Sequence, residues 1–168
     1  MHEGKPISAV HIKNSYASET PVVESDRIYA YFGNVGIWCL DFDGNVLWNK
    51  DIAPHRTRLN WGTASSPVLH EKRLYIVNDN EEDSYLLALD AETGNEEWRT
   101  PREEKSNWST PFVWQNKDRT EIVTAGTGLN RSYSLEGELL WWFKGMSAIM
   151  LVQNRFRKRM RKYAEVLE

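Results

Sequence analysis

A repeated stretch, in which a glycine turn precedes a tryptophan by four residues, constrains the fold of this chain more than any other feature. Its three copies span Gly44–Trp48, Gly94–Trp98 and Gly137–Trp141. The copies recur about every 40 to 50 residues, and a repeat of that length made of short strands and tight turns is typical of a propeller blade. The sequence therefore predicts a β-repeat array.

Turn-forming residues divide each repeat into four short runs that are rich in β-branched and aromatic residues. The first unit has the runs Thr20–Val23, Arg27–Phe32, Gly36–Leu40 and Val46–Lys50. Pro21, Pro67 and Pro111 stand at the start of the first run of each unit, where a missing N–H breaks no ladder bond. We expect an all-β fold, an incomplete β-propeller of four-stranded antiparallel blades with a short C-terminal helical tail.

The repeat also sets the expected domain organisation. We expect a partial propeller over residues 1–146, with a blade remnant at 1–19 and blades at about 20–62, 63–106 and 107–146. A tail at 147–168 follows, in which apolar residues recur every three or four positions beside six Lys or Arg. This pattern predicts a basic amphipathic helix, suited to a membrane surface or a partner. Because it interrupts a repeat, truncation or a shifted reading frame is the favoured explanation.

Charge and cysteine usage exclude several classes of protein. Outside the basic tail, residues 1–146 contain 15 Lys or Arg against 22 Asp or Glu, so the body is acidic and lacks the basic footprint of a nucleic-acid-binding protein. Cys39 is the single cysteine, which excludes an internal disulfide and a thiolate metal cluster. The amino-terminal residues lack the features of a signal peptide, so the location is not specified by the sequence.

The segment Leu86–Trp98 reads Leu-Leu-Ala-Leu-Asp-Ala-Glu-Thr-Gly-Asn-Glu-Glu-Trp and resembles the repeat of PQQ-like β-propellers. This superfamily includes the quinoprotein alcohol dehydrogenases and the lipoprotein of the Bam complex. The resemblance implies a ring of about seven or eight blades. It also implies an extracytoplasmic, periplasmic location in bacteria, and blade-docking roles for Trp48, Trp98 and Trp141.

Redox catalysis within this family needs PQQ, a Ca²⁺ ion and an acidic base, and such enzymes are marked by a vicinal cysteine pair. The chain has no such pair. We therefore expect no cofactor, with PQQ and Ca²⁺ entering only if further blades complete a quinoprotein site.

Aromatic residues shortly before each strand-opening proline are the best candidates for a binding site. They are Trp61 beside Asn60, Trp108 beside Asn107, and more loosely Tyr16, with Arg58 nearby. In a closed propeller these loops would rim the channel, so the six residues are candidates for a ligand-facing ring. The alternative, which we favour, is that the aromatics wedge between blades.

Three further segments offer weaker signals of a metal or phosphate site. Asp79–Asp83 presents alternate oxygen ligands that would suit Ca²⁺, although an acidic solvated loop is the more common arrangement. Asp41–Gly44 resembles the start of an EF-hand loop but lacks its closing carboxylate. Gly126–Gly128 lacks the third glycine of a dinucleotide loop.

The leading functional hypothesis is a non-catalytic propeller scaffold that binds a protein or a small ligand. One alternative is a fragment of a PQQ-dependent dehydrogenase, and another is a truncated or frame-shifted product without a function of its own. We expect no nucleic-acid partner, membrane contact only through the basic tail, and possible self-association through open blade edges.

Overall fold

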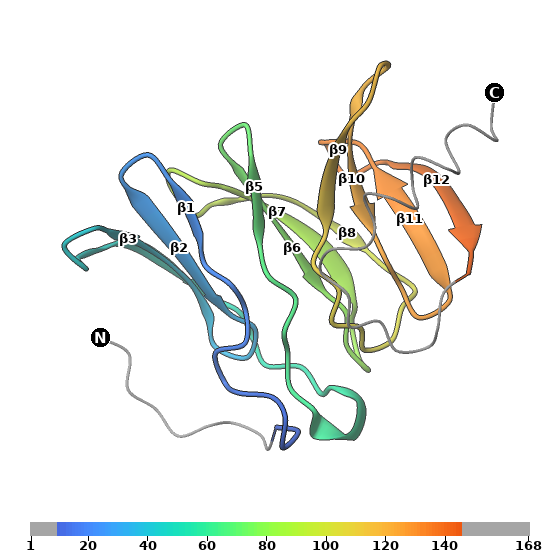
Figure 1. The fold of residues 1–168 in the computed structure, drawn as a ribbon, viewed down its shortest axis with the longest axis horizontal. Coiled ribbons are helices and arrows are strands. Elements are labelled where there is room, and N and C mark those ends of the chain that lie inside the picture. Colours follow the sequence, from blue (N-terminus) through green and yellow to red (C-terminus); the bar gives the residue numbers. More distant parts are fainter. Residues whose placement is uncertain (1–9, 146–168) are drawn as a thin grey trace.

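The computed structural model describes residues 10–145, which form three four-stranded antiparallel sheets and one short 3-10 turn. The sheets follow one another along the chain and stand in a row, like three blades of a fan (Figure 1). This arrangement confirms the all-β, partial-propeller prediction. Residues 1–9 and 146–168, with about half of the expected blade remnant and the whole of the expected helical tail, lie outside the described residues.

Each sheet is a simple meander in which every strand pairs with the next one in sequence. Blade 1 consists of β1 (Val22–Glu24), β2 (Arg27–Phe32), β3 (Gly36–Asp41) and β4 (Val46–Asp51). Blade 2 consists of β5 (Val68–His70), β6 (Arg73–Asn78), β7 (Tyr85–Asp90) and β8 (Glu96–Pro101). Blade 3 consists of β9 (Phe112–Gln115), β10 (Thr120–Thr124), β11 (Leu129–Tyr133) and β12 (Leu139–Lys144).

Hydrophobic side chains fill the two spaces between consecutive blades. One cluster joins blades 1 and 2 and includes Tyr31, Ile37 and Leu87. The other joins blades 2 and 3 and includes Val77 and Ile122. Successive side chains of a strand point to opposite faces, so blade 2 sends alternate residues into both clusters. Because both faces of blade 2 are buried, its central strands β6 and β7 are nearly continuous apolar runs.

The repeated tryptophans dock each blade on the next one. The indole Nε1 of Trp48 donates to the carbonyl of Ala91 at 3.1 Å, and that of Trp98 donates to the carbonyl of Leu135 at 3.0 Å. The glycine of the following repeat faces the ring, since a Cβ built on Gly94 would lie 2.6 Å from Trp48. Glycine and tryptophan are therefore the two halves of one contact between blades.

Trp141 makes a different contact, within its own blade. Its Nε1 donates to the carboxylate of Glu121 at 2.7 Å, and its ring stacks on Phe143 with centroids 5.9 Å apart. In the described part of the chain no fourth blade follows β12. The sequence pattern gave Trp141 the same docking role as the other two tryptophans, and that role stays a prediction.

Hydroxyl groups also link the segments that enter neighbouring inner strands. The backbone N–H of Thr20 donates to Ser66 Oγ at 2.9 Å, and that of Ser66 donates to Thr110 Oγ1 at 3.1 Å. These three residues are the Ser or Thr that precede the strand-opening prolines. The Thr-Pro or Ser-Pro signature therefore also encodes a contact between blades.

Candidate interaction site at the loops entering the inner strands

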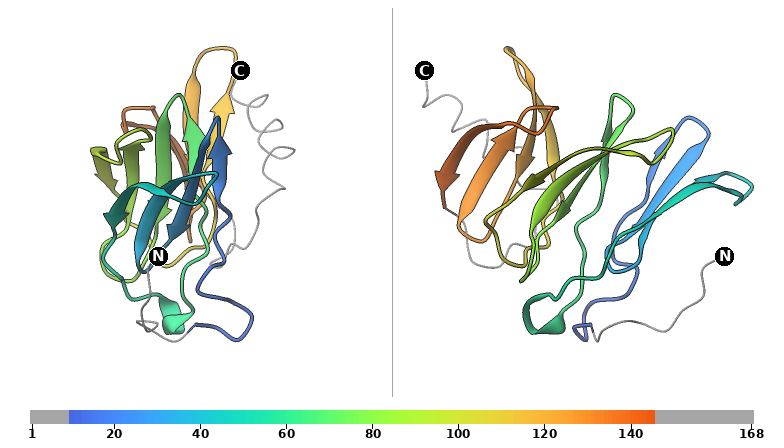
Figure 2. Two further views of the ribbon diagram at one scale, coloured as in Figure 1. Left: turned by 90° about the vertical axis from the view of Figure 1, so that its left-hand side faces the viewer. Right: turned by 180° about the vertical axis from the view of Figure 1, so that it is seen from behind.

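Three loops lead into the inner strands β1, β5 and β9, and they hold all the candidate ligand-facing residues. The loops before β1 and β5 lie side by side beyond one end of the sheets, with the 3-10 turn at the tip of the second loop (Figures 1 and 2). The loop before β9, residues 102–111, packs against the loop before β5 through the contacts described below.

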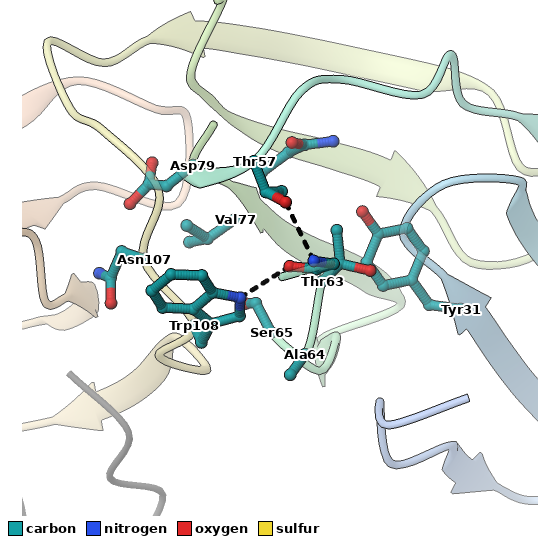
Figure 3. A pocket seen from close by; sticks show the side chains of 11 residues that line it. Tyr31, Thr57, Thr63, Ala64, Ser65, Val77, Asp79, Asn107 and Trp108 are labelled. Carbon is teal, nitrogen blue, oxygen red and sulfur yellow. Dashed lines mark hydrogen bonds between the residues drawn. The ribbon is translucent and has the colours of Figure 1, made fainter. Parts of the chain in front are cut away.

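Trp61 and Trp108 come together in the structure. Their ring centroids are 5.6 Å apart, and His11 meets Trp61 edge-on at 5.1 Å. Trp108 is 7% exposed, and its Nε1 donates to the carbonyl of Gly62 at 2.7 Å (Figure 3). This tryptophan thus ties the loops before β5 and β9 together and leaves little of its ring open to a ligand.

Asn107 is also directed into the protein. It is 5% exposed, its amide donates to the carbonyl of Ala125, and its Oδ1 accepts from the backbone of Ser109 at 3.2 Å. The side chain fastens the loop before β9 to blade 3. It does not present a polar group at the surface.

Arg58, Asn60 and Tyr16 have the opposite placement, because all three are exposed. Arg58 and Asn60 belong to the 3-10 turn Arg58–Asn60, within which Leu59 and Asn60 have left-handed backbone angles, φ +51° and +55°. A leucine rarely adopts this conformation. The turn therefore presents its side chains outward at a conformational cost.

The exposed turn rests on a well-anchored base. Thr57 Oγ1 accepts from the backbone of Gly62 at 3.0 Å, which closes the loop on itself. The backbone N–H of Arg58 donates to Ser106 Oγ at 2.8 Å, which links the turn to the loop before β9. These bonds hold the tip in one conformation.

A cavity of about 10 Å³ lies behind this base, between Thr57, Ala64, Asp79 and Trp108 (Figure 3). That volume is about the minimum for one water molecule. The polar lining suits a bridging water, and the space is too small for an organic ligand.

A buried ion pair joins blade 2 to the loop that leads into blade 3. Arg102 donates to both carboxylate oxygens of Asp79, at 2.8 and 3.0 Å, and both side chains are 0% exposed. Arg102 also donates to Thr124 Oγ1 at 2.6 Å and to Tyr133 Oη at 3.0 Å. Burial alone lowers the pKa of Arg102, but the Asp79 carboxylate outweighs it, so the pKa lies above its usual value.

The remaining oxygen ligands of Asp79–Asp83 serve the loop itself. Asn80 Oδ1 accepts from the backbone N–H groups of Glu82 and Asp83, and Glu81 accepts from Ser106 Oγ at 2.7 Å. Over residues 10–145 no group of three or more His, Cys, Asp or Glu side chains is arranged to hold a metal ion. The side chains of Asp79, Asn80 and Glu81 thus make hydrogen bonds or ion pairs within the protein.

Sequence reasoning missed the Asp79–Arg102 pair and its neighbour, in which Glu104 pairs with Arg131. No spacing rule links an acid and a base that are 23 or 27 residues apart in the sequence. The sequence around Arg102, Arg99-Thr100-Pro101-Arg102-Glu103-Glu104, is polar or charged apart from the proline, so no local signal distinguished the buried arginine from its exposed neighbours.

Comparison with known proteins identifies the repeat. A family model described as outer membrane protein assembly factor BamB matches residues 34–155. No curated protein matches the sequence. In the described part of the chain, no helix has the length and apolar character needed to cross a bilayer.

Several solved structures share the fold. BamB from Moraxella catarrhalis superposes with a TM-score of 0.56 at 13% identity, over 82% of this chain and 38% of that one. A europium-containing methanol dehydrogenase gives 0.57 at 12% identity, over 77% and 32%. Quinohemoprotein alcohol dehydrogenase from Comamonas testosteroni gives 0.57 at 21% identity, over 92% and 24%.

The chain thus spans less than half the length of each of these proteins, and at such identities the likeness shows the fold alone. The family model, in contrast, covers most of the chain. It includes all three glycine–tryptophan stretches, with blade 1 from Asn34 onward and the whole of blades 2 and 3. The chain therefore belongs to the family described as outer membrane protein assembly factor BamB, whose repeats build a PQQ-like propeller.

Proposed function

We propose that the chain is a non-catalytic propeller scaffold that binds another protein at the loops entering β1 and β5. The observation that carries the proposal is the turn Arg58–Asn60, which holds exposed side chains outward on an anchored base despite a left-handed backbone. Strained residues that remain in place often mark functional sites. The family description, which names an assembly factor, supports a protein partner over a small ligand.

The placement of the tryptophans supports the same choice. Trp61 and Trp108 pack against each other, and the nearby cavity admits about one water molecule. Small-molecule sites are generally concave and hundreds of Å³ in volume. The convex tip offers a surface that suits a protein. An extracytoplasmic location is part of the proposal, in keeping with the outer-membrane description of the family.

A PQQ-dependent dehydrogenase is the second candidate function, because one structure with the same fold is named a quinohemoprotein alcohol dehydrogenase and another a methanol dehydrogenase. The test is to add PQQ and Ca²⁺ to the purified chain and to follow reduction of a dye by alcohols and sugars. We expect no reduction. Turnover that depends on PQQ would overturn the scaffold proposal.

A photo-cross-linking experiment tests protein binding directly. A benzoylphenylalanine replaces Leu59 in the producing cells, and a matched variant carries it at Phe42, which is 62% exposed in the β3–β4 turn. We expect a discrete cross-linked protein from position 59 and none from position 42. The absence of any cross-link at position 59, or the same product from both positions, would contradict the proposal.

A further inference from the structure

The two adjoining loops form a basic and apolar surface on an otherwise acidic body. Residues 10–18 and 53–62 contain no Asp or Glu, whereas residues 1–146 as a whole have seven more acidic than basic side chains. We call Ile12, Lys13, Arg58 and Leu59 the loop-end surface. All four are exposed, and no carboxylate of the described residues forms an ion pair with Lys13 or Arg58.

The two halves of this surface are joined by hydrogen bonds to backbone carbonyls of the second loop. The N–H of His11 donates to the carbonyl of Trp61 at 3.3 Å, and Asn14 Nδ2 donates to the same carbonyl at 2.7 Å. The side chain of Asn14 also reaches the carbonyl of Thr63 at 3.2 Å. The views in Figures 1 and 2 agree that the loops lie side by side. Ile12 and Leu59 thus project from one rigid unit.

The aliphatic side chains of the loop-end surface contribute little to folding. Ile12 is 93% exposed and Leu59 is 74% exposed, so most of their apolar area stays in water. Leu59 combines this exposure with a left-handed backbone that glycine would adopt without cost. Neither stability nor solubility favours a leucine there, and burial against a partner would.

Preorganisation adds to the suitability of this surface for binding. A partner would not need to order the loops, because the hydrogen bonds of Thr57, Arg58 and Asn14 already hold them. Avoiding that ordering cost favours affinity. The body carries a net negative charge, whereas these loops contain no acidic residue, so the charge contrast would also orient the approach of an acidic partner.

We propose that the loop-end surface binds an acidic segment of another protein that carries aliphatic or aromatic side chains. This proposal rests on the proposed function and names the chemistry of its partner. Carboxylates of the segment pair with Arg58 and Lys13, and its apolar side chains cover Ile12 and Leu59. An anionic membrane is less suitable, since the loop-end surface has two cations, Lys13 and Arg58, and polybasic membrane-binding segments have about four to eight.

The test uses the full chain and short fluorescein-labelled peptides, measured by fluorescence anisotropy. One peptide mixes Glu and Leu, a second has Gln in place of Glu, and a third has Ser in place of Leu. We expect the first peptide to bind best and its affinity to fall as salt is raised. Arg58→Glu should weaken it about tenfold or more, while Lys144→Glu, at the far edge of blade 3, should not.

Leu59→Gly separates binding from folding. Glycine relieves the left-handed backbone, so the melting temperature should stay the same or rise, while affinity for the first peptide should fall. Phe42→Ser, at the opposite end of blade 1, is the matched control and should leave the affinity unchanged. A structural role for Leu59 alone would instead lower the melting temperature and spare binding.

Several results would overturn the proposal. They are equal binding of the Gln and Glu peptides, no effect of Arg58→Glu and Leu59→Gly, stronger binding to phosphatidylglycerol vesicles than to the peptides, or a chain dimer that Arg58→Glu dissociates. A cross-link at position 59 that persists in Arg58→Glu would refute the acidic partner but leave the proposed function standing. If the cross-linker at position 59 captures no protein in a chain without the Arg58→Glu change, both the proposed function and the acidic partner are refuted.

Discussion

At the scale of single residues, the glycines of the repeat have one conformation but different surroundings. Gly44 and Gly94 both have positive φ, +84° and +74°, so either would be strained by a side chain. A Cβ at Gly94 would also meet the Trp48 ring at 2.6 Å, whereas a Cβ at Gly44 would meet nothing within 4 Å. Comparing substitutions at Gly44 and Gly94 therefore separates the free-energy cost of a strained backbone from the cost of a clash with Trp48.

Gly94→Ala should therefore destabilise the protein much more than Gly44→Ala. The shared left-handed backbone costs about 1–2 kcal/mol in both variants, and overpacking against Trp48 adds about 1–3 kcal/mol in Gly94→Ala only. Urea unfolding of the two variants measures the difference. Equal losses of stability would show that the indole does not press on Gly94.

Glu19 is a buried carboxylate without a cationic partner in the described residues. It is 7% exposed and accepts from the backbone of Gly33 at 3.3 Å. Burial raises the pKa of Glu19, and hydrogen bonds, including one to Thr63, only partly oppose this effect. A carboxyl whose pKa is raised by folding weakens the folded state at neutral pH, and the penalty disappears as pH falls through the raised value.

Glu19→Gln should accordingly raise the melting temperature at about pH 7 and lose this advantage near pH 4, where the native carboxyl is protonated. The amide oxygen can still accept from Gly33. Thermal unfolding followed by circular dichroism at both pH values is the measurement. A gain of the same size at both values would rule out the charge as the cause.

At the scale of loops and strands, the tryptophan of the loop before β9 acts as a clamp between blades. The sequence left open whether Trp108 faces a ligand or wedges between blades. Its burial and its hydrogen bond to Gly62 support the second arrangement. Arg102 has a similar role on the same loop. It binds Asp79 of blade 2 and also donates hydrogen bonds to Thr124 and Tyr133 of blade 3.

Trp108→Ala should lower the free energy of unfolding by about 3–5 kcal/mol, because it removes a large buried side chain. Trp142→Ala is the control, since Trp142 is 55% exposed and its loss should cost much less. Chemical denaturation compares the two. If Trp108→Ala unfolds like the native chain yet no longer binds a ligand, the clamp role is wrong.

Arg102→Met should be costly because it leaves the Asp79 carboxylate buried and unpaired, a loss of about 3–5 kcal/mol. The double variant Asp79→Leu with Arg102→Met removes both charges and should be more stable than the single variant. A double-mutant cycle by urea unfolding measures the coupling. Strictly additive losses would mean that the two charges do not interact.

At the scale of the whole molecule, blade 2 is the centre of stability. Its strands supply both interblade clusters, so each of its faces is covered, while blades 1 and 3 share one cluster each. Stability in repeat proteins comes largely from such nearest-neighbour interfaces. The outward face of blade 1 instead borders an open hollow of about 740 Å³ lined by Phe32, Leu40 and Val46.

Backbone amides of β6 and β7 should therefore exchange with deuterium more slowly than those of the equivalent strands β2 and β3. Exchange from the protected strands requires breaking both interfaces, whereas blade 1 opens by breaking one. Hydrogen-exchange mass spectrometry at peptide resolution makes the comparison. Equal protection in the two blades would indicate that the array unfolds as a single unit.

Self-association through open blade edges stays a prediction. Charged residues disfavour a related arrangement, in which the outer faces of blades 1 and 3 of two copies dock. Arg27 donates to the carbonyl of Glu92 in blade 2, and Arg73 lies 3.6 Å from Glu136 in blade 3. Blade 3 has Glu121 where the strand register of the other blades places these arginines. Head-to-tail docking of two copies would bring that carboxylate toward the acidic turn at Asp43.

Local chemistry made most of the fold predictable from sequence. The run Arg27–Phe32 is rich in aromatic and β-branched residues and lies between turn formers, and β2 has the same bounds in the structure. Similar signals located the other strands to within one or two residues. The Thr-Pro and Ser-Pro motifs also predicted where β1, β5 and β9 begin, each one residue after its proline.

The sequence by itself thus determined the strands, their order within each blade and the repeat that makes blades stack, because these depend on side-chain alternation and turn residues a few positions apart. Only the tertiary structure decided what the loops do. Trp108 meets Gly62 across 46 residues, and Arg102 meets Asp79 across 23. Such contacts depend on how one blade is set against the next. That geometry comes from packing over whole blade faces, which no local pattern encodes.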